Sequence, residues 1–340
     1  MIVAVTLVLS MAGCSKSKES SADVTGGSTS GGGIQVEDNA QKVILSVNNQ
    51  DVSFDELRIY LQSNKEEIES TYGTDIWTLE IDDEGTTYES MLKQAVLDEV
   101  IYLKLVCSQA ESLGITLTED ELLDVDEYTA QFLSNFSSEA MEYYSVDKDI
   151  IRNIYKDNVL SNKVYESLTL NVDTNVSEEE ARQRVFQYIL VGKYGYDAEG
   201  NRFEYTQDQL EEAQSRAIKL HEEALTTNNF KDFALANSDD QDEVEITVGK
   251  GDMMTQLEKV AFALKEGEIS EVVDTDEGWF IFYCVEEMNQ EATDAKKEEI
   301  ISERQEEAFK EKYAAWDSSK EVSIDQELFD SISLTGTIVQ

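Results

Sequence analysis

The segment from Ser177 to Glu287 constrains the fold more than any other part of the chain, because its elements follow in a definite order. A β run at Phe186–Val191 precedes a long charged stretch and a helix at Gln207–Thr226. A short helix, a glycine-containing stretch, a third helix and two strands complete the segment. The order β-α-α-β-α-β-β predicts a mixed α and β domain, in which Gly267 and Gly278 occupy turns that need a positive φ.

Residues 253–282 of this segment read MMTQLEKVAFALKEGEISEVVDTDEGWFIF. They resemble the parvulin family of peptidyl-prolyl isomerases, which shows a Met, an aromatic residue or Leu four positions on, and then AFxLxxGExSxPVxTxxGxHII. Ten positions agree in register: Met253, Leu257, Phe262, Leu264, Gly267, Glu268, Ser270, Val273, Thr275 and Gly278. The resemblance extends over about Ser177 to Glu287 and implies a parvulin-like fold.

The resemblance also implies a catalytic centre with two His residues and a Cys or Asp, and here both histidines are replaced. Tyr188 stands at the first His position and Phe280 at the second, whereas Asp240 matches the Cys/Asp position. Tyr188 can still donate a hydrogen bond to Asp240, but Phe280 has no polar atom. We therefore treat Tyr188, Asp240 and Phe280 as degenerate catalytic positions.

By the same resemblance, Met253, Leu257 and Phe262 form the substrate-binding wall of a proline pocket. Met253 and Leu257 are one helical turn apart and can project to one side. The alternative is that both are plain core residues. The family's GGDLGxF loop is reduced to the sequence GKGD at residues 249–252, and no basic cluster flanks the expected pocket. The absence of such a cluster argues against a phosphate-directed parvulin.

The region before this domain has the pattern of a helical module. Capping boxes at Ser53/Glu56, Thr118/Glu121 and Ser177/Glu180 mark helix starts. Helices are predicted at Phe54–Tyr72, Met91–Leu113 (ended by Gly114), after Thr118, and at Asp147–Leu168. The stretches VNNQDVSFDELRIYL, LKQAVLDEVIYLKLVCSQAESLGITLTEDEL and DKDIIRNIYKDNVLSNKVYESL resemble the N-terminal chaperone domain of SurA-type and PrsA-type foldases. A generic helical bundle is the alternative.

A long charged helix is predicted after the parvulin-like segment, at Thr293–Trp316, with Ile301, Phe309, Tyr313 and Trp316 on one stripe. In the resembling foldases such a helix packs back on the N-terminal module, and we expect the same here. The expected fold is thus α+β: a helical chaperone module at residues 41–176, an inserted parvulin-like domain at 177–288, and a C-terminal return segment at 289–340.

The first residues resemble a bacterial lipoprotein signal. An apolar run ends in Leu9-Ser10-Met11-Ala12-Gly13-Cys14, with small residues directly before the cysteine. The resemblance implies cleavage after residue 13 and a lipid on Cys14, and two acyl chains suffice for stable anchoring. Residues 14–40, rich in Ser and Gly over 15–33, predict a flexible tether. The alternative is an ordinary cleaved signal with an incidental cysteine.

Composition excludes several classes of function. A net charge of −45 excludes nucleic-acid binding, which needs clustered Lys and Arg. The single histidine, His221, excludes a site built from several His ligands, and there is no CxxC or other metal-ligand spacing, so no metal is expected. No cofactor or small-molecule site is expected either. Cys107 and Cys284 lie far apart in apolar segments, so both are predicted to be free buried thiols.

Three functions are weighed from these patterns. The first is an extracytoplasmic, lipid-anchored foldase for unfolded, exported polypeptides, with a degenerate prolyl-isomerase site. The second is a non-enzymatic holdase that uses the parvulin-like domain only to bind clients. The third, a solute-binding lipoprotein, needs repeated βα units over most of the chain, whereas helices dominate here.

Overall fold

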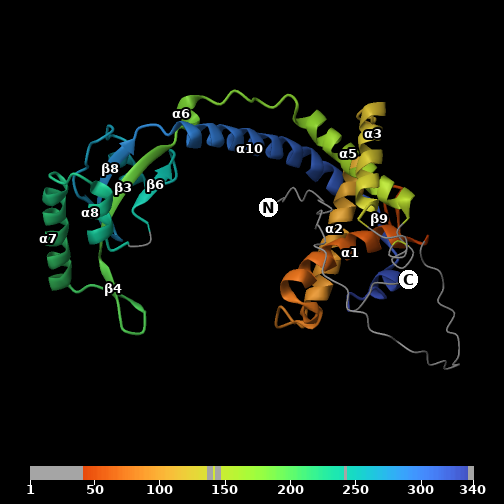
Figure 1. Cartoon of the computed structure of the whole chain (residues 1–340), viewed down its shortest axis with the longest axis horizontal. Helices are drawn as coiled ribbons and strands as arrows, with labels where there is room; N and C mark the ends of the chain where they lie inside the picture. Colours follow the sequence, from red (N-terminus) through yellow and green to blue (C-terminus); the bar gives the residue numbers. More distant parts are fainter. Residues whose placement is uncertain (1–40, 136–140, 142–146, 241–242, 336–340) are drawn as a thin grey trace. The chain divides into compact units, whose positions relative to one another are not determined.

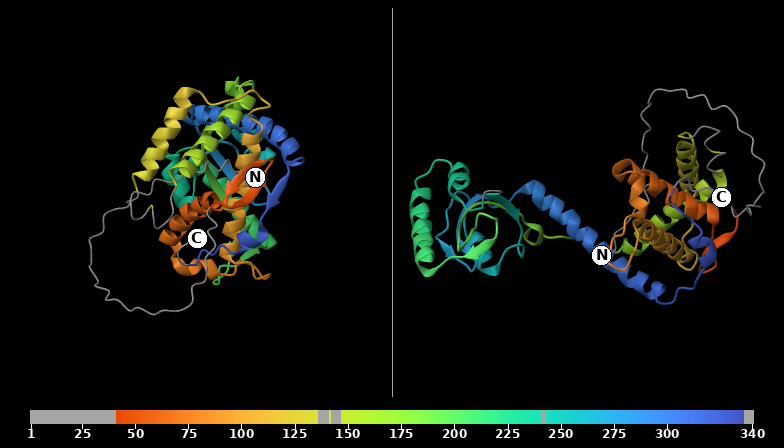
Figure 2. Two further views of the ribbon diagram at one scale, coloured as in Figure 1. Left: turned by 90° about the vertical axis from the view of Figure 1, so that its right-hand side faces the viewer. Right: turned by 90° about the horizontal axis from the view of Figure 1, so that it is seen from below.

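The computed structural model describes residues 41–135, 141, 147–240 and 243–335, and Figures 1 and 2 show it from three sides. Cys14 and the expected tether lie outside these ranges. The described residues divide into two compact units, one formed by those up to residue 170 with those from residue 308 on, and the other by those from 171 to 307. Each unit has its own hydrophobic core and is described separately below.

The first unit combines helices with a small antiparallel sheet in the order β2-β1-β9. Asn48 and Asn49 have φ values of 50° and 65° and make the two-residue turn between β1 and β2. Its elements are β1 (Val43–Val47), β2 (Gln50–Ser53), α1 (Phe54–Tyr72), the 3₁₀ helix η1 (Thr74–Thr78), α2 (Tyr88–Ser108), α3 (Glu119–Leu133), α5 (Lys148–Thr169), β9 (Val322–Ile324) and α11 (Gln326–Asp330). The sequence predicted α1 and α5 closely, whereas α2 begins three residues earlier and ends five residues earlier than expected. Gly114 has the positive φ of 69° that a helix-ending glycine permits, but it closes a run of turns after α2.

Two of the three predicted capping boxes form only halfway. Thr118 and Glu121 make both reciprocal hydrogen bonds. The side chains of Ser53 and Ser177 each accept a hydrogen bond from the backbone N–H three residues on. The glutamates at those positions, however, do not accept the return hydrogen bond from the serine N–H. Glu56 pairs with Lys104 at 2.8 Å, and Glu180 pairs with Arg304 at 2.6 Å. In both cases a nearby cation offers the carboxylate a stronger partner than the backbone N–H.

A buried ionic triad ties three helices of the first unit together. The Lys104 Nζ on α2 lies 2.8 Å from Glu56 Oε1 on α1 and 2.6 Å from Asp157 Oδ2 on α5. The Lys104 side chain is 5% exposed, so this cation is held almost entirely by its two carboxylates. Removing the Lys104 ammonium would leave the buried Glu56 and Asp157 carboxylates without a compensating charge.

The C-terminal part of the chain contributes to the same unit. Phe309 and Tyr313, near the end of α10 (Gln290–Asp317), contact Tyr102 of α2, and Phe309 also contacts Tyr165 of α5. After α10, β9 pairs with β1. Buried side chains then continue into the core: Leu328, Phe329, Ile332 and Leu334.

The second unit is a four-stranded antiparallel sheet between two helical layers. Figure 1 shows α7 and α8 beside the sheet, and their apolar residues pack on one face, while α9 packs on the other. The strand order is β6-β3-β8-β7. The elements are α6 (Glu178–Ala181), β3 (Arg184–Gly192), β4 (Tyr194–Tyr196), β5 (Arg202–Glu204), α7 (Gln207–Ala224), α8 (Phe230–Asn237), β6 (Glu245–Val248), α9 (Thr255–Ala261), β7 (Val273–Asp274) and β8 (Gly278–Glu286). The expected order of elements is present, with an additional hairpin, β4–β5, in the stretch expected only to be charged.

The two glycines singled out in the sequence have different roles. Gly267 has a φ of 84°, as predicted for a turn. The prediction for Gly278 was wrong, because its φ is not positive and it opens strand β8 opposite Gly192. A Cβ at Gly278 would lie 2.4 Å from the backbone oxygen of Val191. Close approach of two strands, and not turn geometry, requires glycine there.

Candidate functional site

Aromatic residues line the sheet face that α9 covers. Tyr188 on β3 is paired with Phe282 on β8, and Leu190 with Phe280. We call Phe186, Tyr188, Phe280 and Phe282 the aromatic face. The Phe280 and Phe282 rings are stacked with centroids 6.0 Å apart, and each lies 6.2 Å from the Tyr188 ring. The side-chain period of two along paired strands therefore gathers residues that are about 90 positions apart in the sequence.

Tyr188 carries the polar contact of this face. Its Oη donates to Asp240 Oδ2 at 2.5 Å, which is the hydrogen bond expected from the sequence. Burial raises the pKa of Tyr188 well above its usual range, and the Asp240 hydrogen bond and charge add to the effect. The phenol therefore remains a protonated donor at all ordinary pH values.

The segment carrying Asp240 is fixed to β3 by its own neighbours. Ser238 Oγ accepts from the backbone N–H of Leu190 at 3.0 Å, and Asp239 Oδ2 accepts from that of Gly192 at 2.9 Å. Asp239 also pairs with Arg216 of α7 at 2.7 Å. These bonds position the Asp240 carboxylate beside Tyr188 independently of the Tyr188 bond.

The other residues expected in the site belong to the same cluster but differ in exposure. Leu257 on α9 is buried, whereas Met253 and Phe262 are half-buried at the two ends of that helix. Phe280 is half-buried and contributes only its ring. The structure thus brings together Tyr188, Asp240, Met253, Leu257, Phe262 and Phe280. Leu257 is buried in the core of this unit, as the alternative interpretation of the sequence expected. Its role in substrate binding therefore stays a proposal.

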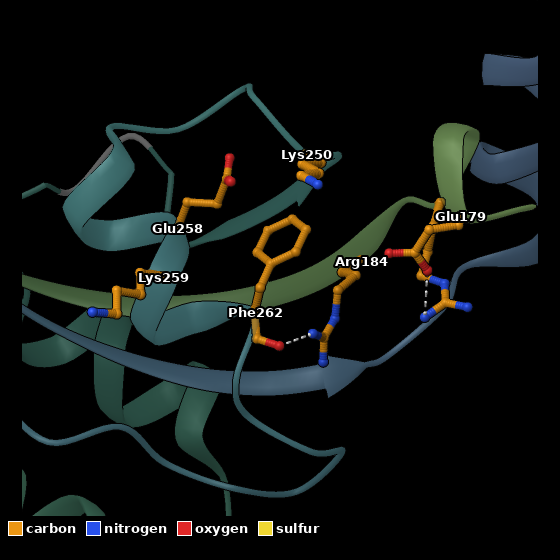
Figure 3. Close-up of a pocket in the computed structure, with 7 residues that line it drawn as sticks. Glu179, Arg184, Lys250, Glu258, Lys259 and Phe262 are labelled. Atoms are coloured by element: carbon orange, nitrogen blue, oxygen red, sulfur yellow. Dashed lines mark hydrogen bonds and ion pairs between the residues drawn. The ribbon is translucent and has the colours of Figure 1, made fainter.

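A pocket of about 250 Å³ lies beside this cluster, and Figure 3 shows its lining. Of the site residues expected from the sequence, only Phe262 contributes to it. The remaining lining residues are Glu179, Arg182, Arg184, Lys250, Glu258 and Lys259. Four of these residues are basic, so the expectation that no basic cluster flanks the site was wrong. The sequence did not reveal the cluster because its members come from the end of α6, the start of β3, the 249–252 turn and α9. The one available signal was the lysine between Gly249 and Gly251.

Arg184 forms the inner wall of this pocket. Its Nη1 donates to the carbonyl of Phe262 at 2.6 Å and its Nη2 to that of Leu264 at 2.5 Å. These carbonyls follow the end of α9, where a cation compensates the negative end of the helix dipole. The guanidinium also lies over the Phe186 and Phe262 rings, at 5.3 and 5.4 Å from their centroids.

The described residues contain no group of three or more His, Cys, Asp or Glu side chains that would suit a metal ion. None of the helices within the described ranges has the length and hydropathy needed to cross a bilayer. Cys107 and Cys284 are free and buried, as predicted. Burial raises the pKa of both thiols, which keeps them protonated and unreactive.

Comparison with known proteins places two domain families on the chain. Residues 29–144 match the family model of the SurA-like N-terminal domain, and residues 200–287 match that of the PPIC-type PPIase domain. The second match includes Asp240 and Phe280, while β3 with Tyr188 precedes it.

Two foldase proteins align with most of the chain. The foldase protein PrsA of Caldanaerobacter subterraneus subsp. tengcongensis is 27% identical over 244 residues, which cover 70% of this chain and 72% of that protein. The foldase protein PrsA of Clostridium acetobutylicum is 22% identical over 311 residues, covering 84% and 88%. Among solved structures, foldase PrsA of Lactococcus lactis covers 85% of this chain and 97% of its own, at 12% identity and a TM-score of 0.33.

Proposed function

We propose, since this chain is a PrsA/SurA-like protein with a PPIC-type peptidyl-prolyl isomerase domain, that it is an extracytoplasmic foldase for unfolded, exported polypeptides. The observation that carries the proposal is the hydrogen bond from Tyr188 to Asp240 at the edge of the aromatic face. This hydrogen bond retains one polar pair at the position where the family has its polar network. The pair lies next to the aromatic face, whose rings would contact a proline ring.

The chemistry that this site must perform is modest. Rotation about a peptide bond has a barrier of about 18–20 kcal/mol because of its partial double-bond character. No nucleophile or metal is needed, since an enzyme lowers the barrier by binding the twisted amide better than the planar one. Phe280 and Phe262 would contact the proline ring. The Tyr188 Oη donates its hydrogen bond to Asp240 and would accept one from the substrate backbone.

Replacement of the second histidine by Phe280 weakens this activity without removing the binding surface. A phenylalanine ring stacked on Phe282 adds apolar contact but offers no hydrogen bond to the twisting amide. We therefore expect slower isomerisation than in parvulins with the complete polar network, together with retained affinity for Xaa-Pro segments.

We assign the domains as residues 41–176 for the helical chaperone module, 177–288 for the parvulin-like domain and 289–340 for the C-terminal segment. The division of the structure at residue 170 supports the first boundary, and the end of the PPIC-type match at residue 287 supports the second. In the structure, residues 289–307 belong to the same compact unit as the parvulin-like domain. Residues 1–13 would be the signal peptide and 14–40 the tether. A lipid on Cys14 would hold the protein at the outer surface of the cell membrane, which the sequence before that cysteine supports.

Refolding of a denatured protein whose slow phase is prolyl isomerisation tests the proposal. The full chain should shorten the slow phase and reduce aggregation of the client. Tyr188→Phe, which removes only the hydroxyl, should lengthen the slow phase again and leave the suppression of aggregation intact. If the wild type suppresses aggregation but leaves the slow phase unchanged, the domain is a client-binding module without isomerase activity.

A further inference from the structure

The pocket beside Phe262 has a charge opposite to that of the chain as a whole. The protein has a net charge of −45, yet this pocket is lined by four cationic and two acidic side chains. Within the described part of the chain, Arg184, Lys250 and Lys259 have no carboxylate at ion-pair distance. In 0.15 M salt, charges farther than about 8 Å are largely screened, so these local cations dominate the potential inside the pocket.

The turn that carries Lys250 is held in place by specific contacts. Gly249 donates its N–H to Asp252 Oδ2 at 2.7 Å, and Gly251 donates to Glu258 Oε2 at 2.6 Å. A Cβ at Gly249 would lie 2.3 Å from the side-chain nitrogen of Gln183 and 3.4 Å from the backbone oxygen of Arg182, so the turn packs directly against the residues before β3. The reduced family loop therefore brings Lys250 into the same pocket as Arg182, which follows α6, and Arg184, which begins β3.

The two acidic residues of the pocket are already engaged. Glu258 accepts the Gly251 hydrogen bond, and Glu179 lies 3.6 Å from Arg182. Glu178, which does not line the pocket, also lies 3.6 Å from Arg182. In Figure 3 the Phe262 ring lies between Glu258 and Arg184, with Lys250 near it, while Lys259 points away from the ring.

We propose that this pocket binds a carboxylate of a client polypeptide, next to the apolar segment that the aromatic face receives; the polypeptide nature of the ligand rests on the function proposed above. Lys250 supplies a charge that no carboxylate of the described residues compensates, Arg182 adds a guanidinium shared with Glu178 and Glu179, and Arg184 supplies the wall. The partial neutralisation by Glu179 and Glu258 suits a singly charged carboxylate better than a doubly charged phosphate. Phe262 belongs to both the pocket and the cluster on α9, so one extended segment with neighbouring apolar and acidic residues fits both.

Binding of matched peptides to the full chain tests this proposal. The first peptide is acetylated and amidated, with a Phe-Pro pair followed by glutamate. The second has glutamine in place of the glutamate, and the third has this glutamine and a free C-terminal carboxylate. We expect the glutamate peptide to bind about tenfold more tightly than the glutamine peptide, with a preference that decreases as salt is added. The third peptide shows whether a chain terminus can supply the carboxylate in place of a side chain.

Two charge-matched double variants locate the effect. Lys250→Gln with Arg182→Gln should reduce the preference to within about twofold, whereas Lys219→Gln with Lys231→Gln, on α7 and α8 of the opposite sheet face, should retain it. Retention of the preference in the first variant overturns the proposal. Equal affinity for the first two peptides also overturns it. So does displacement of the bound glutamate peptide by millimolar inorganic phosphate. If the glutamate and glutamine peptides bind with equal affinity, only the carboxylate site is wrong; if neither peptide binds, the proposed client binding fails as well.

Discussion

Removing the buried cation of the first unit should destabilise that unit strongly. In Lys104→Met, the carboxylates of Glu56 and Asp157 lose the ammonium at 2.8 and 2.6 Å, while their side chains are only 9% and 15% exposed. Loss of one partner from a buried ionic group typically costs about 3–5 kcal/mol, because the remaining charge is left uncompensated. We expect a loss in this range for the free energy of unfolding at about pH 8.

The loss should be smaller in acid. Burial raises the pKa of Glu56 although the Lys104 ammonium opposes the effect, so removing the ammonium raises this pKa further. A carboxyl whose pKa is higher in the folded state than in the unfolded state binds more protons when folded. Its stabilising contribution is present at low pH and is lost as the pH rises through the folded pKa. At about pH 5 the variant should therefore recover part of the lost stability.

Urea unfolding followed by tryptophan fluorescence measures this in a Trp279→Phe background, because the remaining tryptophans, Trp77 and Trp316, both lie in the first unit. Lys163→Met is the matched control, since its pair with Glu121 is 27% and 30% exposed, and it should cost less than about 1 kcal/mol. A cost for Lys104→Met below about 1 kcal/mol, or an equal cost at both pH values, would refute the reasoning.

Three further substitutions test other parts of the structure. Gly278→Ala should destabilise the second unit by roughly 1–3 kcal/mol, because its Cβ would lie 2.4 Å from the Val191 oxygen; an unchanged unfolding midpoint would contradict this. Phe309→Ala should destabilise the first unit by roughly 3–5 kcal/mol, since the ring is 3% exposed among aromatic neighbours, and an effect confined to the second unit would argue against that packing. Tyr188→Ala should reduce prolyl-isomerase activity more than Asp252→Ala does, because only Tyr188 belongs to the aromatic face; equal losses would count against this site.

The sequence predicted the elements of both units well where periodicity and capping residues act locally. The bounds of α1 agree with the structure, and the order of strands and helices in the second unit is as expected. The hydrogen bond between Tyr188 and Asp240 was also anticipated, because the family pattern fixes both positions. The helix bounds depend on short spacings within one stretch of sequence, whereas the Tyr188–Asp240 bond joins positions 52 residues apart and was expected only from the family resemblance.

Features that depend on distant partners outside the family pattern were not predictable. Glu56 and Glu180 leave their capping boxes for cations 48 and 124 positions away. The need for glycine at 278 comes from a neighbouring strand, and local sequence gives no sign of it. The basic pocket likewise gathers residues from separate segments, so a search for a basic cluster along the sequence could not find it.

Prolyl cis/trans exchange in a Xaa-Pro peptide, measured by NMR with the full chain, tests the central claim most directly. Uncatalysed exchange takes tens to hundreds of seconds, so modest acceleration is readily detected. The account predicts exchange above the uncatalysed rate, a decrease in Tyr188→Phe, and an increase in Phe280→His, which restores the family residue. Exchange at the uncatalysed rate in the wild type, with the fold intact and with peptide-induced shifts at Met253 and Phe262, would contradict the claim that this domain is an isomerase.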